Sequence, residues 1–140
     1  MDFSSFIKSG KVKKGEKDVA LAKSLFNTAK QDLKFLETLN ITDLAARKVF
    51  SNYYDVLRSV IEAIAALDGF KIYSHEAYTF YLKENKIEET AALKYDRFRK
   101  IRNKINYYGK AMNKEEAIEH KKEIKDIIKI LVYKYLTKIE

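Results

Sequence analysis

Apolar side chains recur every three or four residues along most of this chain, which is the spacing of one face of an α-helix. With their capping residues, the predicted helices cover residues 17–39, 42–69, 74–85, 88–107 and 113–139. The second is the most strongly patterned, and no stretch alternates as a strand over a useful length. Five helical segments with short connections predict an all-α fold, an antiparallel bundle of four to five helices.

Residues that favour helix ends lie at the limits of these segments. Thr42 and Ser74 are plausible N-caps, and Asn113 with Glu116 has the spacing of a capping box. Gly69 and Gly109 lie where a left-handed residue ends a helix. The chain has no proline and only four glycines, which favours long uninterrupted helices.

The N-terminal residues are rich in lysine and lack a helical pattern. Four lysines and two glycines fall between residues 8 and 15. We therefore expect residues 1–15 to form a basic, partly mobile arm. Residues 16–140 have the length of a single domain.

Composition excludes several classes of site and location. The chain has no cysteine, so it has no disulfide framework, thiolate metal site or cysteine nucleophile. It lacks a Gly-rich phosphate loop and a His-Glu-x-x-His pair, and we expect no metal and no cofactor. The first residues do not resemble a signal peptide, and no apolar run is long enough to span a membrane. We expect a cytoplasmic protein without membrane contact.

The positive charge is unevenly distributed. The formal net charge is +8, which favours polyanionic partners. Between Lys86 and Lys110, eight basic residues stand against three acidic ones. Arg97, Arg99 and Arg102, three of the five arginines, fall within six residues. Arginine carries a planar, permanently charged fork that suits phosphate groups.

Helix geometry separates Arg102 from its two neighbours. At about 100° per residue, Arg102 lies about 40° from the apolar axis through Phe98, whereas Arg97 and Arg99 point towards solvent. An arginine on an apolar side needs a partner. That partner is either a phosphate or a carboxylate on another helix, such as Asp55 or Glu62. Polar and aromatic side chains that can assist in binding follow Arg102 closely: Asn103, Asn106, Tyr107 and Tyr108.

Residues 98–109, FRKIRNKINYYG, resemble the late-helix motif of HEPN domains (higher eukaryotes and prokaryotes nucleotide-binding). Residues 73–78, YSHEAY, and the Ala-rich second helix also resemble that family. The resemblance implies a helical bundle that forms a homodimer. It also implies an RNA or nucleotide ligand, in a toxin–antitoxin system or beside a minimal nucleotidyltransferase. It further implies that Arg102 stabilises the phosphate and that Asn103 is its polar companion.

The chain departs from this motif where active members carry a histidine, four to six positions after the polar residue that follows the arginine. Tyr107, Tyr108 and Gly109 stand there instead. A tyrosine, with an ordinary pKa near 10, is a base about three units less suited to neutral pH than histidine. We expect His75 to be a surface or capping residue and His120 to be structural.

Three hypotheses follow for the function. The first is RNA or nucleotide binding through Arg97, Arg99, Arg102, Asn106 and Tyr108. The second is a metal-independent endoribonuclease toxin that uses Arg102, Asn103 and Tyr107, or a distant histidine. The third is a non-catalytic interaction module for a nucleotidyltransferase.

Overall fold

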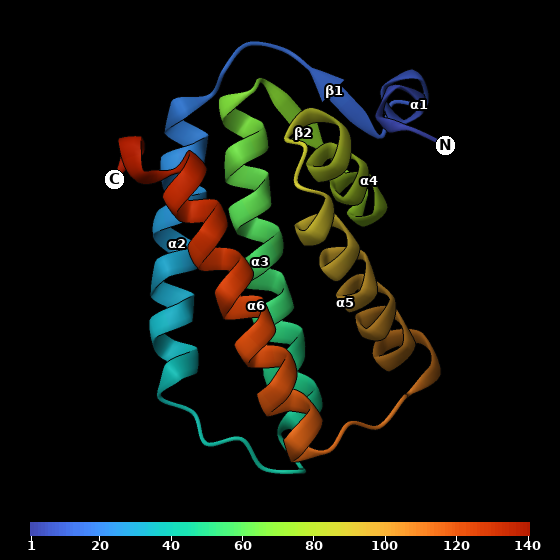
Figure 1. Cartoon of the computed structure of the whole chain (residues 1–140), viewed down its shortest axis with the longest axis vertical. Coiled ribbons are helices and arrows are strands. Elements are labelled where there is room, and N and C mark those ends of the chain that lie inside the picture. Colours follow the sequence, from blue (N-terminus) through green and yellow to red (C-terminus); the bar gives the residue numbers. More distant parts are fainter.

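The computed structural model describes all residues 1–140, and four long helices dominate it (Figure 1). These are α2 (Val19–Glu37), α3 (Ala46–Leu67), α5 (Glu89–Tyr108) and α6 (Lys114–Tyr135). Each runs in the direction opposite to the one before it, as Figure 1 shows. The all-α class is therefore confirmed, as is a bundle built on four long helices. No helix is both long enough and apolar enough to cross a lipid bilayer.

Helix α3 is the centre of the bundle. Thirteen of its 22 residues are buried, because apolar side chains occupy more than one of its faces. Its closest packing is with α2, which lies beside it, and with α6, which crosses in front of it in Figure 1. Helix α5 and the short helix α4 (His75–Phe80) cover the remaining side.

The predicted helix ends are mostly confirmed. Asn113 and Glu116 form the expected capping box at the start of α6, and Gly109 ends α5 with a φ of 63°. Thr42 was the wrong cap for α3, because that helix begins at Ala46. The Thr42 hydroxyl accepts a hydrogen bond from the backbone N–H of Ala45 and closes the preceding turn instead.

The third predicted helix changes character halfway along. Ser74 is its N-cap residue, α4 ends at Phe80, and a π-helical turn follows over Tyr81–Asn85. A short 3₁₀ turn, Thr137–Ile139, similarly follows α6. Both the π-helical turn and the 3₁₀ turn lie within residue ranges that the sequence pattern predicted as α-helix.

The N-terminal residues differ from the arm that we expected. Residues Phe3–Lys8 form helix α1, and Val12–Lys14 form strand β1. Strand β1 pairs antiparallel with β2 (Phe70–Ile72), so the fold contains a two-stranded ribbon. Phe3, Phe6 and Val12 are buried in the main core. Three-residue strands are too short to show an alternating pattern, and each has its partner far away in the sequence.

The turn after α3 meets the N-terminal segment at very close range. Gly69 has a φ of +85°, and a Cβ atom on it would lie 2.3 Å from the carbonyl oxygen of Gly15. The backbone N–H of Gly15 donates a 2.7 Å hydrogen bond to the Gly69 carbonyl. Only glycine at position 69 permits this approach, which anchors the ribbon to α3.

We expect Gly69→Ala to lower the free energy of unfolding by about 3 kcal/mol, from backbone strain and steric overlap together. Gly10 provides a matched control, because its φ of +80° is similar but a Cβ atom there would meet nothing within 4 Å. Gly10→Ala should therefore cost only about 1 kcal/mol. Urea unfolding of both variants measures the difference, and equal decreases in stability would contradict the close approach.

Candidate functional site

Arg102 lies on the side of α5 that faces α3, as helix geometry predicted. Its guanidinium carbon is 5.7 Å from the centre of the buried Tyr54 ring, within the range of a cation–π contact. Arg58, Arg97 and Arg99 each pair with a carboxylate. Arg102 makes no such ion pair and donates no hydrogen bond within the protein. Its hydrogen-bonding groups are available to a ligand.

The two carboxylates considered as structural partners do not bind Arg102. Glu62 instead accepts hydrogen bonds from Arg58 and from the Tyr78 hydroxyl, both at 3.1 Å. Asp55 is half-buried and makes no ion pair. Burial raises the pKa of the Asp55 carboxyl, while the positive charges of Arg58 and Arg102 oppose that shift. Asp55 is thus an electrostatic neighbour of Arg102 without being its bonded partner.

Arg102 borders a polar hollow of about 400 Å³ between the first half of α3 and the last half of α5. Such a volume is within the range of small-ligand sites. Its lining has three cationic side chains, one carboxylate and one apolar residue: Arg47, Lys48, Ser51, Asn52, Asp55, Arg102, Ile105 and Asn106. We call this the α3–α5 hollow. Its charge and its amide and hydroxyl groups suit an anionic ligand.

The other two arginines of the cluster are engaged elsewhere. Arg97 is about half exposed and bonds Glu123 of α6 at 2.6 Å. Arg99 was expected to face solvent, and that was wrong. Its side chain is only 13% exposed, because it bonds Asp96 at 2.8 Å and lies 3.6 Å from Glu76. Neither arginine lines the α3–α5 hollow.

Of the remaining predicted residues, one lines the α3–α5 hollow and the others lie outside it. Asn106 lines the hollow one turn after Arg102, as the spacing of four indicated. Asn103 is partly exposed and lies outside the hollow. Tyr107 and Tyr108 are 73% and 84% exposed at the end of α5. The fold therefore brings Asn106, and not the tyrosines, beside Arg102.

His75, which we expected to be a surface or capping residue, contacts the same tyrosine as Arg102. The Tyr95 hydroxyl donates its only proton to the carbonyl oxygen of His75 at 2.8 Å. It must therefore accept from the Tyr54 hydroxyl, 2.9 Å away. Tyr54 in turn accepts from Nδ1 of His75 at 2.9 Å. Counting protons places the imidazole proton on Nδ1 and leaves a lone pair on Nε2.

The surroundings of His75 keep its ring neutral. Burial lowers the pKa of His75 to about 4, and the positive charges of Arg58, Arg102 and Arg99 act in the same direction. His120, in contrast, packs edge-on against Phe50 and Phe98, with centroid distances of 5.3 and 5.6 Å. This packing between aromatic rings agrees with the structural role that we expected for His120.

Of the residues that α3 contributes to the hollow, sequence reasoning named only Asp55, as a possible partner of Arg102, and missed the others. Arg47, Ser51 and Asp55 follow one another at intervals of four, and Lys48 and Asn52 lie beside them. This spacing marks a polar stripe on the helix whose other faces are apolar. The stripe was a usable signal, because a polar stripe on the most buried helix must face either solvent or a polar site.

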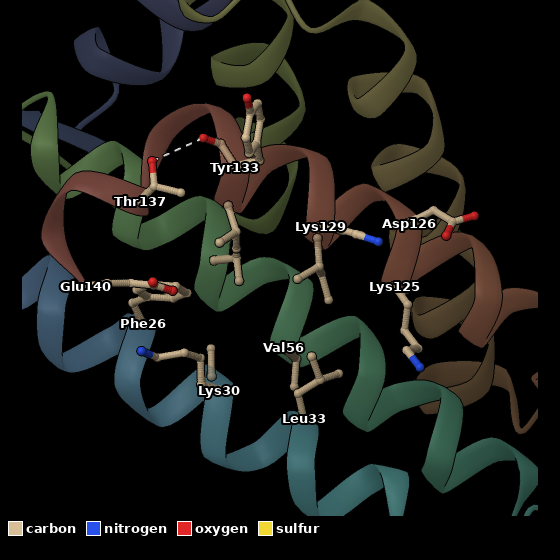
Figure 2. Close-up of a pocket in the computed structure, with 14 residues that line it drawn as sticks. Phe26, Lys30, Leu33, Val56, Lys125, Asp126, Lys129, Tyr133, Thr137 and Glu140 are labelled. Atoms are coloured by element: carbon tan, nitrogen blue, oxygen red, sulfur yellow. Dashed lines mark hydrogen bonds between the residues drawn. The ribbon is translucent and has the colours of Figure 1, made fainter.

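The largest hollow lies elsewhere, between α2 and α6 with α3 beneath (Figure 2). It has a volume of about 630 Å³ and a mainly apolar floor that includes Phe26, Leu33 and Val56. Figure 2 shows Lys30, Lys125 and Lys129 around it, on α2 and α6. Lys125 is already paired with Glu37. This hollow contains none of the predicted site residues and no histidine.

No group of three or more histidine, aspartate or glutamate side chains is placed to hold a metal ion. Comparison of the chain with protein-family models, with curated proteins and with solved structures finds no match. The class that fold and site together define is a helical bundle with an unpaired arginine at a polar hollow.

The depressed pKa of His75 predicts a specific decrease of stability in acid. The unfolded chain binds a proton near pH 6.5, and the folded protein binds it only near pH 4. The free energy of unfolding should therefore fall as the pH drops from 6.5 towards 4, and His75→Gln should reduce that fall. In His120→Gln, His75 is the only histidine, and NMR titration of its ring should give a midpoint near 4. A midpoint at 6.5 or above would contradict the burial described.

Proposed function

We propose that this protein binds RNA or a nucleotide through phosphate groups in the α3–α5 hollow. The observation that carries the proposal is Arg102, which is held over the Tyr54 ring and has no carboxylate partner. A charged side chain that is partly removed from water and unpaired is costly to keep, unless a ligand completes it. A phosphate oxygen pair matches the guanidinium fork.

The other groups around the hollow support the same ligand class. Arg47 and Lys48 add two positive charges, and Asp55 contributes the one opposing carboxylate. Asn52 and Asn106 supply amide groups that can bond a sugar or a base. Phosphate contacts of this kind position a nucleic acid without reading its sequence.

The proposal includes a HEPN-type protein, because the Arg102–Asn103 step and four antiparallel helices are what that resemblance implies. A homodimer and a nucleotidyltransferase partner belong to the same proposal. Arg97, Arg99 and Tyr108, which the sequence predicted as binding residues, contribute less to binding in this proposal. The two arginines are bonded to carboxylates, and Tyr108 is exposed and does not line the hollow.

Replacing Arg102 by glutamine should weaken binding at least tenfold, because a charge-assisted hydrogen bond contributes about 1.5–3 kcal/mol. The measurement is fluorescence anisotropy with a labelled oligouridylate at low salt, with UMP as the competing mononucleotide. The slope of log K against log salt should also decrease by about 0.7 for each phosphate that the variant no longer neutralises.

Arg97→Gln is the matched control for this variant. It removes the same charge from the same helix, but Arg97 lies outside the hollow and is bonded to Glu123. We expect less than a threefold effect from it. If both variants weaken binding equally, the positive charge of α5 as a whole, and not the hollow, causes the binding, and the proposal fails.

A second function, metal-independent RNA cleavage, is favoured by one specific observation. Arg102 and His75 contact the same Tyr54 side chain, and Nε2 of His75 carries a free lone pair. In such a reaction, a base removes the proton of a ribose 2′-hydroxyl. The 2′-oxygen then bonds to phosphorus as the bond from phosphorus to the 5′-oxygen breaks, and the 5′-oxygen leaves with the proton that the base returns. With its pKa near 4, His75 is a weak base, so slow turnover is expected.

Cleavage of oligouridylate in the presence of a chelator, scored for 2′,3′-cyclic phosphate ends, tests this function. If His75 is the base, His75→Gln and Arg102→Gln should both lower the rate at least a hundredfold, whereas Tyr107→Phe should leave it unchanged. A decrease confined to Tyr107→Phe would move the base to the end of α5. Absence of cleavage above the Arg102→Gln background would eliminate the enzyme and leave the binding function.

A further inference from the structure

We propose that the β1–β2 ribbon is a second phosphate-binding surface, which contacts the backbone of a nucleic acid. It lies beyond the end of α3 opposite to the α3–α5 hollow, and it shares no residue with that hollow. Figure 1 shows the ribbon beside α1, at the end of the bundle where α3 finishes. This surface does not depend on Arg102.

The pairing of the two strands fixes which side chains face outward. Val12 is opposite Ile72, and both are buried against the core. Lys13 is directly opposite Lys71, so their side chains project together from the other face. The backbone N–H of Tyr73 donates to the carbonyl oxygen of Lys11 at 2.8 Å, which continues the same register. The outer face therefore presents Lys11, Lys13, Lys71 and Tyr73.

Two like charges directly opposite each other destabilise a strand pair. Neither Lys13 nor Lys71 makes an ion pair with a carboxylate that would relieve this repulsion. The same is true of the surrounding lysines: Lys8, Lys11, Lys14 and Lys17. Some lysines elsewhere in the fold find partners, such as Lys86 with Asp68 at 2.8 Å, whereas others, such as Lys23 and Lys34, are unpaired but lie apart from one another on a helix. The ribbon is thus a concentration of uncompensated positive charge.

A second hollow, of about 390 Å³, opens beside the ribbon. Four lysines line it, namely Lys13, Lys14, Lys17 and Lys71. Its two carboxylates are Glu16 and Asp18, and Asp18 is occupied as the N-cap of α2. The close approach of Gly15 and Gly69 forms part of its wall, so the lysines project from a backbone that is fixed.

Tyr73 distinguishes a nucleic acid from other polyanions. Tyr73 is 62% exposed at the end of the ribbon, and Nζ of Lys13 lies 5.8 Å from the centre of its ring. An exposed aromatic ring beside unpaired lysines can stack on a base while the lysines bind phosphates. The outer face has no aliphatic side chain to insert into a lipid bilayer, which disfavours a membrane surface.

The test uses the double variant Lys13→Gln/Lys71→Gln and a labelled 20-nucleotide oligouridylate. Because two phosphates are no longer neutralised, the slope of log K against log salt should fall by about 1.4. The control is Lys23→Gln/Lys34→Gln, which removes two exposed, unpaired lysines from α2. The control slope should stay within about 0.3 of the unmodified protein, since neither lysine belongs to the ribbon. Oligothymidylate should respond as the RNA does, because both carry the same phosphates.

Three results would overturn the proposal. They are an equal effect of the control variant, a decrease confined to RNA, or binding to vesicles containing phosphatidylserine without binding to either oligonucleotide. Mononucleotide binding separates this surface from the α3–α5 hollow. The ribbon variant should keep its affinity for UMP, whereas Arg102→Gln should not. If Arg102→Gln has no effect and the ribbon variant still does, the proposed function fails and this surface stands.

Discussion

The burial of α3 on almost every side is the constraint on which the rest of the structure depends. Thirteen of its residues are removed from water, and a buried aliphatic or aromatic side chain contributes about 1.5–3 kcal/mol. No single neighbouring helix can cover such a surface, so α2 and α6 take two sides and the α4–α5 segment takes the third. The alanines at positions 63, 65 and 66 let these neighbours approach closely in the second half of α3.

Other polar side chains of α3, outside the stripe that lines the hollow, lie against α4 and α5. Arg58, Glu62 and Tyr54 cannot face solvent freely, because α4 and α5 lie over them. Tyr78 donates a hydrogen bond to Glu62, and Tyr95 and His75 bond Tyr54. Arg58 donates to Glu62 on its own helix. Arg102 enters the same region and touches only a ring face. An arginine with no bonded partner, beside Tyr54, Tyr95, His75, Arg58 and Glu62, which all make hydrogen bonds, is the feature of this cluster that packing does not explain.

The sequence predicted the long helices and Arg102 well, because both depend on local periodicity. An apolar residue every three or four positions is sufficient to place α3 and α5 and to turn Arg102 inward. It was insufficient for Arg99, whose partners Asp96 and Glu76 lie on two different elements. Nor could it bring His75 to Tyr54, since that contact depends on how α4 turns after β2. The ribbon was missed for the same reason, because its strands are 58 positions apart and only three residues long.

The two ends of the bundle along α3 are both basic, but the basic groups differ. At one end, arginines and amides surround a hollow, where a fixed guanidinium can select a phosphate by geometry. At the other, exposed lysines on a ribbon offer charge without direction. Helix α3 holds these ends about 25 Å apart, judged by its rise per residue. A single mononucleotide cannot span that distance, whereas a nucleic acid strand of about seven nucleotides, at about 3.4 Å each, matches it in length. For the two surfaces that we propose, this separation matches a chain of phosphates better than a single nucleotide.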